Sequence, residues 1–284
     1  MVTKENFFCD FENKWCPGCG NFQILDAMKD AFAAMDLPPE KLLIVSGIGQ
    51  AGKTPHFLRC NFFHGLHGRA LPVATGAKIA NHELTVVVSS GDGDCYGEGG
   101  NHFVSAIRRN IDITLLVHNN RVYGLTKGQA SPTSDMGFKT KMQPHGVIAG
   151  AFNPLTVALA LGAGFVARGF SGSKDHLTQL IQKAVAHKGF SMIDIMQPCV
   201  SFNPVNTFAW YKKRIFDLAE EDYDPADPAA AFVMAGKQDD RIPIGVLYQK
   251  TSPSYTDRID HLARGTLIGF SYDRDRVQSV MDTA

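Results

Sequence analysis

The chain has 284 residues, and its 28 Lys and Arg residues equal its 28 Asp and Glu residues in number. This net charge does not predict a basic face for nucleic acid or an acidic tail, so we expect no nucleic-acid partner. Apolar residues make up 44% of the sequence, which is enough to fill the core of one large or two modest domains. No apolar run is long enough to span a membrane, and the start of the chain, MVTKENFFCD, lacks a signal-peptide profile. We therefore expect a cytoplasmic protein that does not enter a membrane.

Helical and strand patterns alternate along the first 200 residues. Leu25, Met28, Phe32 and Met35 share one face of a predicted helix that ends before Pro38. Strands are predicted at 42–46, 84–90, 113–118, 164–168 and 191–196, and further helices at 72–81, 97–109, 154–161 and 173–186. The alternation predicts an α/β fold with a doubly wound, mostly parallel sheet that helices cover on both faces.

The pattern changes at Ser201, after which aromatic residues are scattered among Pro and Asp with few periodic runs. We therefore divide the chain into an α/β domain at 1–200 and an irregular C-terminal extension at 201–284. The aromatic content is too high for simple disorder. We therefore expect the extension to pack on another chain, and folding back onto its own core is the open alternative.

Two polar signatures follow neighbouring strands of the predicted sheet. The run LTVVVSS ends in Gly91-Asp92-Gly93, and the run ITLLVH ends in Asn119-Asn120. Because ligands of open α/β sheets lie outside the carboxyl ends of the strands, both signatures are expected to face one ligand. A carboxylate and a carboxamide oxygen are hard ligands that suit Mg²⁺ or Ca²⁺, and the glycines allow close approach of a phosphate. The alternative is an ordinary Asp-Gly turn with an Asn helix cap.

The six cysteines do not form the pattern of a secreted disulfide framework. Cys16 and Cys19 form a Cys-Pro-Gly-Cys turn, and Cys199 follows the strand at 191–196, at the same predicted sheet edge as Asp92. Thiolates in this arrangement suit a [4Fe–4S] cluster or zinc. A CxxC turn also occurs in zinc knuckles and redox turns, so the motif alone leaves these alternatives open.

Several longer motifs point to one family. They are WCPGCG at 15–20, SGIGQAGKTPHF at 46–57, LHGRALPVATG at 66–76, GDGDCYGEGGNHF at 91–103, HNNRVYGLTKGQASPTS at 118–134 and QPCVSFN at 197–203. Over residues 14–205 the chain resembles the thiamine-diphosphate-binding β subunit of two-subunit 2-oxoacid:ferredoxin oxidoreductases. The sequences at 118–134 and 197–203 are most similar to those of subunits that use 2-oxoglutarate.

The resemblance implies a thiamine diphosphate-binding fold and a set of coenzyme contacts. Asp92, Asn120 and the main-chain oxygen of Val122 would bind Mg²⁺ against the diphosphate. The implied coenzyme-binding residues are Gly47, Ile48, Gly49, His67, Gly91, Asp92, Gly93, Asp94, Asn120, Val122, Gly124 and Leu125.

The resemblance also implies one [4Fe–4S] cluster bound by Cys16, Cys19 and Cys199. Relatives have the fourth ligand directly after the SGIG motif, where this chain has Gln50. Cys60, which follows in the same loop, is the expected substitute. The alternatives are Cys9 and a cluster with three cysteines and a non-cysteine ligand.

The remaining roles concern the substrate and the partners. The resemblance implies that Lys53 binds the distal carboxylate of the 2-oxoacid, that Leu125 lies near the substrate, and that His67 and Arg69 contact thiamine or substrate. Taken alone, Lys53 would be a surface lysine, and His67 with Arg69 a helix-cap pair.

No glutamate of this chain is a convincing partner for the aminopyrimidine ring, so the resemblance assigns that glutamate to an α subunit. Coenzyme A would accept the acyl group and ferredoxin the electrons, in an αβ or (αβ)₂ assembly. The alternatives are a pyruvate or broad 2-oxoacid enzyme, a non-redox thiamine enzyme whose cysteines bind zinc or nothing, and a zinc-stapled nucleotide-binding module.

Overall fold

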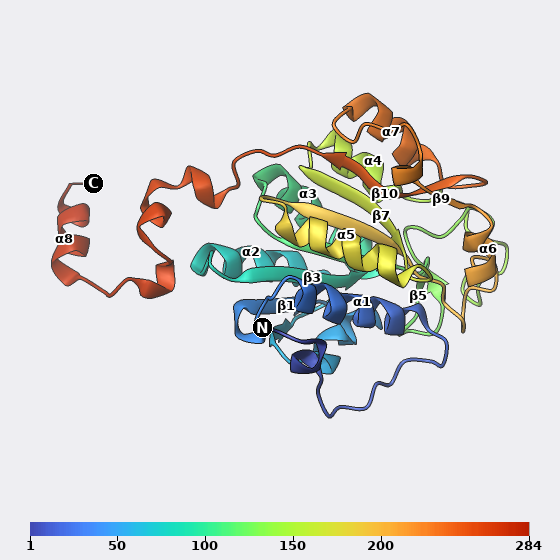
Figure 1. Cartoon of the computed structure of the whole chain (residues 1–284), viewed down its shortest axis with the longest axis horizontal. Helices are drawn as coiled ribbons and strands as arrows, with labels where there is room; N and C mark the ends of the chain where they lie inside the picture. The colour runs from blue at the N-terminus through green and yellow to red at the C-terminus, as the bar shows by residue number, and fades with distance from the viewer. Residues whose placement is uncertain (284) are drawn as a thin grey trace.

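The computed structural model describes residues 1–283, which form a central eight-stranded sheet (Figure 1). The strands lie in the order β2-β1-β3-β4-β8-β7-β10-β9. Their bounds are β1 Leu42–Ser46, β2 Asn61–His64, β3 Thr85–Gly91, β4 Thr114–Asn119, β7 Phe165–Phe170, β8 Ser191–Met196, β9 Ile215–Asp217 and β10 Ile242–Gln249. All neighbouring strands are parallel except β7 and β10. This arrangement confirms the predicted doubly wound, mostly parallel sheet.

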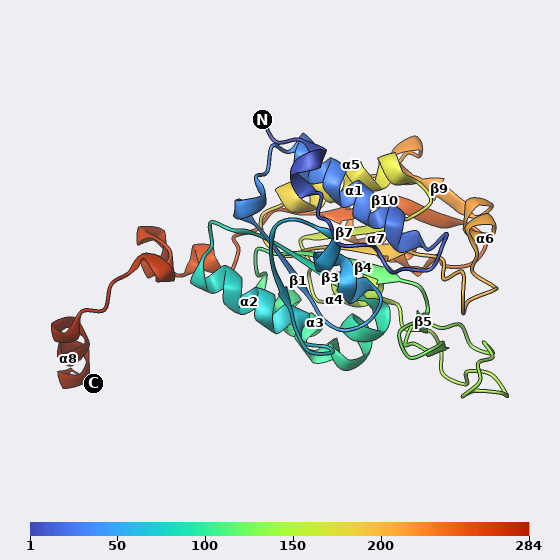
Figure 2. The same cartoon turned by 90° about the horizontal axis from the view of Figure 1, so that it is seen from below.

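Helices cover both faces of the sheet (Figure 2). One face carries α1 (Gly20–Ala34) and α5 (Lys174–Ala186), and the other carries α2 (Ala70–Ala80), α3 (Gly100–Arg109), α4 (Pro154–Ala160) and α7 (Pro228–Gly236). Because side chains alternate along a strand, Leu116 packs with α1 and α5, whereas its neighbours Leu115 and Val117 pack with α2 and α3. The central strands are buried on both faces, which explains their unbroken apolar runs.

Two elements near the site differ from the sequence predictions. A π-helical segment, Gly93–Glu98, lies between β3 and α3, where an ordinary helix from residue 97 was expected. Strand β2 was not predicted, because all four of its residues are exposed at the sheet edge and show no apolar alternation. A short hairpin, β5 (Val122–Tyr123) with β6 (Gln129–Ala130), follows β4.

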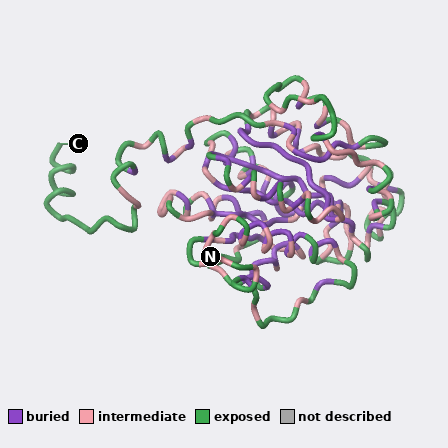
Figure 3. Tube along the Cα trace, viewed as in Figure 1, coloured by how far each residue is buried: buried purple, intermediate pink, exposed green. Residues whose placement is uncertain are grey.

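The region after Ser201 divides into two parts. Residues up to Gln249 fold back onto the core, because β10 pairs with β7 and β9 pairs with β10. The sheet therefore continues across residue 200. Residues 250–283, which include α8 (Arg274–Asp282), lead away from the sheet and are mostly exposed (Figures 1 and 3). The irregular extension is confined to this shorter segment. None of the helices formed by residues 1–283 combines the length and the apolar character needed to cross a membrane.

Asn110 connects the start of this segment to the sheet. Its backbone is left-handed, with φ of +51°, and it follows α3. Its Oδ1 accepts a hydrogen bond from the Phe190 N–H at 2.9 Å, and its Nδ2 donates to Oγ of Ser252 at 3.1 Å and to the Pro253 carbonyl at 3.0 Å. One side chain thus joins a helix end, the start of β8 and the C-terminal segment.

We expect Asn110→Ala to lower the free energy of unfolding by about 2 to 3 kcal/mol, because it removes these hydrogen bonds and leaves a β-carbon in a left-handed backbone. Asn110→Gly is the matched variant, since it removes the same hydrogen bonds but relieves the backbone strain. Chemical denaturation should therefore rank wild type above Gly and Gly above Ala. Equal midpoints for all three proteins would contradict this role.

Candidate active site

The carboxyl ends of β1, β3, β4 and β8 meet at one edge of the sheet. Gly91 at the end of β3 pairs with His118 of β4, and Asn119 pairs with Met196 of β8. The segments that follow these strands, beginning at Gly47, Asp92 and Asn120, therefore emerge side by side, as the strand order of the sheet requires.

A cavity of about 160 Å³ lies at this edge. It is lined by Ile48, Gly49, Gln50, Ala51, His67, Gly91, Asp92, Gly93, Asp94, His118, Asn120, Val122, Tyr123, Gly124, Leu125 and Thr126. The structure thus brings together every residue of the expected coenzyme set except Gly47. Gly47 lies behind the wall, where an added β-carbon would collide with the carboxylate of Asp94, so only glycine fits there.

Asp92 is buried, with 1% of its surface exposed, and its Oδ2 accepts hydrogen bonds from two hydroxyl groups. Ser131 Oγ lies at 2.5 Å and Thr133 Oγ1 at 2.6 Å. Because both hydroxyls contact Oδ2, Oδ1 is left for a cation. Burial raises the pKa of Asp92 to about 6. A divalent cation would reverse this effect by stabilising the carboxylate.

The two asparagines after β4 point in different directions. Asn120 lines the cavity, and its Oδ1 accepts a hydrogen bond from the Val122 N–H at 2.9 Å. Arg121, which follows Asn120, has a left-handed φ of +60°, and its carbonyl accepts a hydrogen bond from Ser134 Oγ at 2.6 Å. This turn directs both Asn120 and Val122 to the cavity. Of the two asparagines, Asn120 is therefore the one that can bind a metal ion.

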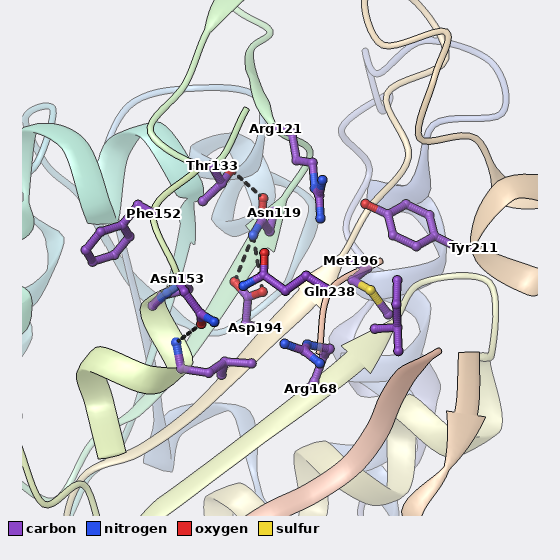
Figure 4. A pocket seen from close by; sticks show the side chains of 13 residues that line it. Asn119, Arg121, Thr133, Phe152, Asn153, Arg168, Asp194, Met196, Tyr211 and Gln238 are labelled. Carbon is purple, nitrogen blue, oxygen red and sulfur yellow. Dashed lines mark hydrogen bonds between the residues drawn. The ribbon is translucent and has the colours of Figure 1, made fainter. Parts of the chain in front are cut away.

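Asn119 instead belongs to a buried polar network behind the site (Figure 4). Its Nδ2 donates to both carboxylate oxygens of Asp194, at 3.1 and 3.2 Å, and its Oδ1 lies 2.8 Å from Thr133 Oγ1. The network surrounds a cavity of about 20 Å³, the size of a water molecule. Through Thr133 it connects the interior of the sheet to Asp92.

Asp194 and Arg168 complete this network. Burial raises the pKa of Asp194 and lowers that of Arg168 to about 10. The Arg168 guanidinium donates to the carbonyls of Ala235 and Lys237, both at 2.9 Å, so its charge is hydrogen-bonded. Such a satisfied network holds the segments behind the cavity in one arrangement.

Asp94 hydrogen-bonds to the segments that form the other wall of the cavity. Its Oδ1 accepts hydrogen bonds from the Ile48 N–H at 3.1 Å and the Gly68 N–H at 2.7 Å, and lies 2.7 Å from His67 Nδ1. Its Oδ2 accepts from Ser90 Oγ at 2.5 Å. The carboxylate thus holds the segments 46–49 and 67–69 against β3. Both of its oxygens accept hydrogen bonds from protein groups.

Glu98 is a residue that the sequence motifs did not assign to the site. Its Oε2 lies 2.9 Å from His67 Nε2 and accepts a hydrogen bond from the Tyr123 hydroxyl at 3.0 Å. The π-helical segment ends at Glu98, which sets it opposite His67. Its position could not be deduced from sequence, because an ordinary helix would rotate this side chain differently.

Two expected substrate contacts do not line the cavity. Arg69 is exposed at the start of α2, and its guanidinium lies 2.6 Å from His102 Nε2. Its expected contact with thiamine or substrate stays a prediction. Lys53 is half-buried in the 3₁₀-helix Ala51–Phe57, one turn beyond the cavity wall. Its role stays a prediction. Leu125 is 43% exposed at the cavity mouth.

A second cavity, of about 30 Å³, gathers three of the four expected cluster ligands. Cys16, Cys19 and Cys199 line it. Two side chains donate hydrogen bonds to the sulfurs: Gln197 Nε2 to Cys19 at 3.3 Å, and Ser201 Oγ to Cys16 at 3.2 Å. Burial, together with the nearby Cys199 and Cys16 thiols, raises the pKa of Cys19 to about 11. A bound metal would be needed to hold this thiol as a thiolate.

Cys60 does not join this group, so its assignment as the fourth ligand is corrected. The 3₁₀-helix carries the chain back to the start of β2, where Asn61 pairs with Leu43 near the amino end of β1. Cys60 therefore lies near the amino ends of the strands, about 13 Å from their carboxyl ends by the rise of four residues. Proximity in sequence was misleading because the chain reverses between Gln50 and Cys60.

The other two cysteines lie elsewhere as well. Cys9 donates to the carbonyl of His56 at 3.4 Å, and Cys95 is buried in the core beside α2 and α3. Within residues 1–283 no three His, Cys, Asp or Glu side chains converge on one point for a single metal ion. An iron–sulfur cluster places its thiolates at separate irons and therefore needs a wider arrangement.

Comparisons with known proteins agree with this geometry. Residues 47–195 match the family "Thiamine pyrophosphate enzyme, C-terminal TPP binding domain", and residues 199–264 match the family of the C-terminal region of pyruvate ferredoxin oxidoreductase beta subunits. The 2-oxoacid:ferredoxin oxidoreductase subunit beta of Saccharolobus solfataricus is 46% identical over 269 residues, covering 86% of this chain and 88% of the relative. The chain belongs to the β subunits of 2-oxoacid:ferredoxin oxidoreductases.

Further relatives of this β subunit have 2-oxoglutarate in their names. The 2-oxoglutarate oxidoreductase subunit KorB of Mycobacterium tuberculosis is 43% identical over 199 residues, covering 70% of this chain and 53% of the relative. A solved 2-oxoglutarate:ferredoxin oxidoreductase from Magnetococcus marinus, with 2-oxoglutarate, coenzyme A and succinyl-CoA bound, matches with a TM-score of 0.91 and 35% identity. The match covers 98% of this chain and 96% of that one. The family resemblance inferred from the sequence motifs is confirmed.

A substitution at Thr133 tests whether its hydroxyl stabilises the Asp92 carboxylate. We expect Thr133→Val, which removes the hydroxyl and keeps the shape, to lower the free energy of unfolding by about 1 to 3 kcal/mol, because a buried carboxylate loses a donor. Thr178→Val is the control, since the Thr178 hydroxyl bonds only the Lys174 carbonyl of its own helix. Equal denaturation midpoints for the two variants would show that the Thr133 hydroxyl does not stabilise Asp92.

Proposed function

We propose that this β subunit, with an α subunit, catalyses the oxidative decarboxylation of 2-oxoglutarate to succinyl-CoA and CO₂, or the reverse carboxylation. Electrons pass through a [4Fe–4S] cluster to ferredoxin. The observation that carries the proposal is a shared wall: Gln50, Asn120 and Gly124 line both the Asp92 cavity and the cysteine cavity. A coenzyme in the first cavity is therefore adjacent to a redox centre in the second.

The cavity residues suit thiamine diphosphate with Mg²⁺. Asp92, Asn120 and the Val122 carbonyl provide the oxygen ligands that Mg²⁺ prefers. Glycines at 91 and 93 allow the diphosphate to approach the backbone. When bound, thiamine diphosphate supplies the carbon nucleophile for the 2-oxo group and accepts electron density as CO₂ leaves. The residues of this chain would bind and orient this group.

The α subunit supplies what this cavity lacks. Glu98 contacts His67 and Tyr123, but among residues 1–283 no glutamate lines the cavity itself, so we assign the glutamate that assists proton loss from the coenzyme to the α subunit. Leu125 is exposed at the mouth of the cavity, and Lys53 lies beyond its wall. Lys53 contributes a positive charge for the distal carboxylate of 2-oxoglutarate in the assembled enzyme.

The C-terminal segment supplies a surface for this assembly, which we propose to be αβ or (αβ)₂. Its exposed apolar side chains are Leu267, Ile268, Phe270, Tyr272, Val277, Val280 and Met281. Such a concentration of exposed apolar side chains is typical of a surface that a partner covers.

The central experiment is anaerobic co-purification with the α subunit, followed by iron, sulfide and thiamine assays and a panel of 2-oxoacids. We expect bound thiamine diphosphate, iron with sulfide, and coenzyme A-dependent reduction of ferredoxin that is faster with 2-oxoglutarate than with pyruvate. A preference for pyruvate would contradict the substrate. Zinc without iron would favour non-redox thiamine chemistry.

Asp92→Ala tests the metal site. We expect at least about a tenfold loss of Mg²⁺-dependent thiamine diphosphate affinity, measured by calorimetry, because the cation loses its only carboxylate ligand. Asp240→Ala, at an exposed position, should bind as wild type does. Unchanged affinity in Asp92→Ala would refute its assignment as a ligand.

Cys199→Ser tests the cluster. We expect it to lose more than about half of the iron and the visible absorption of the cluster, since one thiolate is removed. Cys60→Ser is the matched control and should keep both, because Cys60 lies near the amino ends of the strands. Iron loss in the Cys60 variant instead would overturn the geometric assignment.

A further inference from the structure

The cysteine cavity offers three thiols to a cluster that has four irons. Each iron at a corner of a [4Fe–4S] core takes one ligand from its surroundings. Cys16, Cys19 and Cys199 account for three of them. Cys9, Cys60 and Cys95 do not line this cavity, so residues 1–283 bring no fourth thiol to it.

Gln50 also lines this cavity, and its side chain has an acceptor atom to which no group donates a hydrogen bond. Its side-chain oxygen, Oε1, is buried and has no hydrogen-bond partner. A buried carbonyl oxygen without a donor is unfavourable, and a metal ligand bond is one way to satisfy it. The side chain lies on the wall shared with the Asp92 cavity, between the coenzyme site and the thiols.

The backbone of Gln50 is held firmly in this position. Its carbonyl accepts a hydrogen bond from Trp15 Nε1 at 2.8 Å and another from the Lys53 N–H at 3.3 Å. Trp15 directly precedes Cys16, so the same contact links Gln50 to the CxxC turn. On the other side, a β-carbon added to Gly124 would lie 3.5 Å from Cγ of Gln50.

Gln197 is a rival in this cavity, because its Oε1 is also buried without a partner. Its Nε2, however, donates to the Cys19 sulfur at 3.3 Å, so its amide presents N–H groups to the cluster side. Gln197 thereby acts as a donor to a cluster ligand, and Gln50 is the group that can supply an oxygen.

We propose that the side-chain oxygen of Gln50 binds the fourth iron, giving a cluster with three thiolates and one neutral oxygen ligand. The inference rests on the proposed electron-transfer function and specifies its cluster. A neutral ligand leaves the cluster one unit less negative than four thiolates would, so its reduction potential is higher. The iron bound by oxygen is also held less tightly than its neighbours, since thiolate is the softer, better ligand for this iron.

This fourth iron should leave on mild oxidation. With ferricyanide as the oxidant, a [4Fe–4S]²⁺ core would lose one electron to ferricyanide and one iron as Fe²⁺, leaving a [3Fe–4S]⁺ core on the three cysteines. Charge and iron are balanced in this step.

The test uses the complete enzyme, purified anaerobically with its α subunit and titrated with ferricyanide under electron paramagnetic resonance. We expect wild type to give the three-iron signal, Gln50→Ala to give it at least about tenfold faster, and Gln50→Cys to resist conversion and keep four irons. Gln179→Ala, at an exposed position of α5, is the control and should convert at the wild-type rate. Gln197→Ala tests the rival, and it should convert more slowly than Gln50→Ala.

Several outcomes would overturn the inference. They are equal conversion of wild type, Gln50→Ala and Gln50→Cys, or faster loss of iron in Gln197→Ala than in Gln50→Ala. Either result would leave the proposed function intact, because a cluster would still be present. A wild-type enzyme with bound thiamine diphosphate but neither iron nor sulfide would overturn both proposals.

Discussion

The parallel direction of β1, β3, β4 and β8 is the constraint on which the site depends. Parallel strands end at the same edge of a sheet, so polar segments that are far apart in the sequence emerge next to one another. Asp92 follows β3, Asn120 follows β4, and Cys199 follows β8 by three residues. The apolar side chains that bury the sheet on both faces therefore also fix the spacing of the residues that carry the chemistry.

Buried polar groups fix the positions of the loops at this edge of the sheet. Asp94 fastens two loops to β3, and Asp194 fixes Asn119, which in turn contacts Thr133 beneath Asp92. These carboxylates are removed from water, so they are stable only when their hydrogen bonds are satisfied. The left-handed backbone of Arg121 adds to this order, because it persists only where its surroundings hold it.

The two cavities differ in the kind of metal ligand that they contain. One contains hard oxygen donors at Asp92 and Asn120, and the other contains the soft sulfurs of three cysteines. Hard and soft donors select different metals, so a magnesium-bound coenzyme and an iron–sulfur centre can lie side by side without exchange of their ions. Gln50 belongs to both walls.

The sequence by itself determined the sheet, its helical layers, the family and the meeting of Asp92, Asn120, Cys16 and Cys199 at one edge. These features depend on periodicity and on local motifs, which a single segment displays. Only the tertiary structure decided that Cys60 lies near the amino ends of the strands, that β9 and β10 complete the sheet, and that Glu98 faces His67. The positions of Cys60, β9 and β10 depend on where the chain turns back, and that of Glu98 depends on a π-helical segment, which leaves no periodic pattern in the sequence.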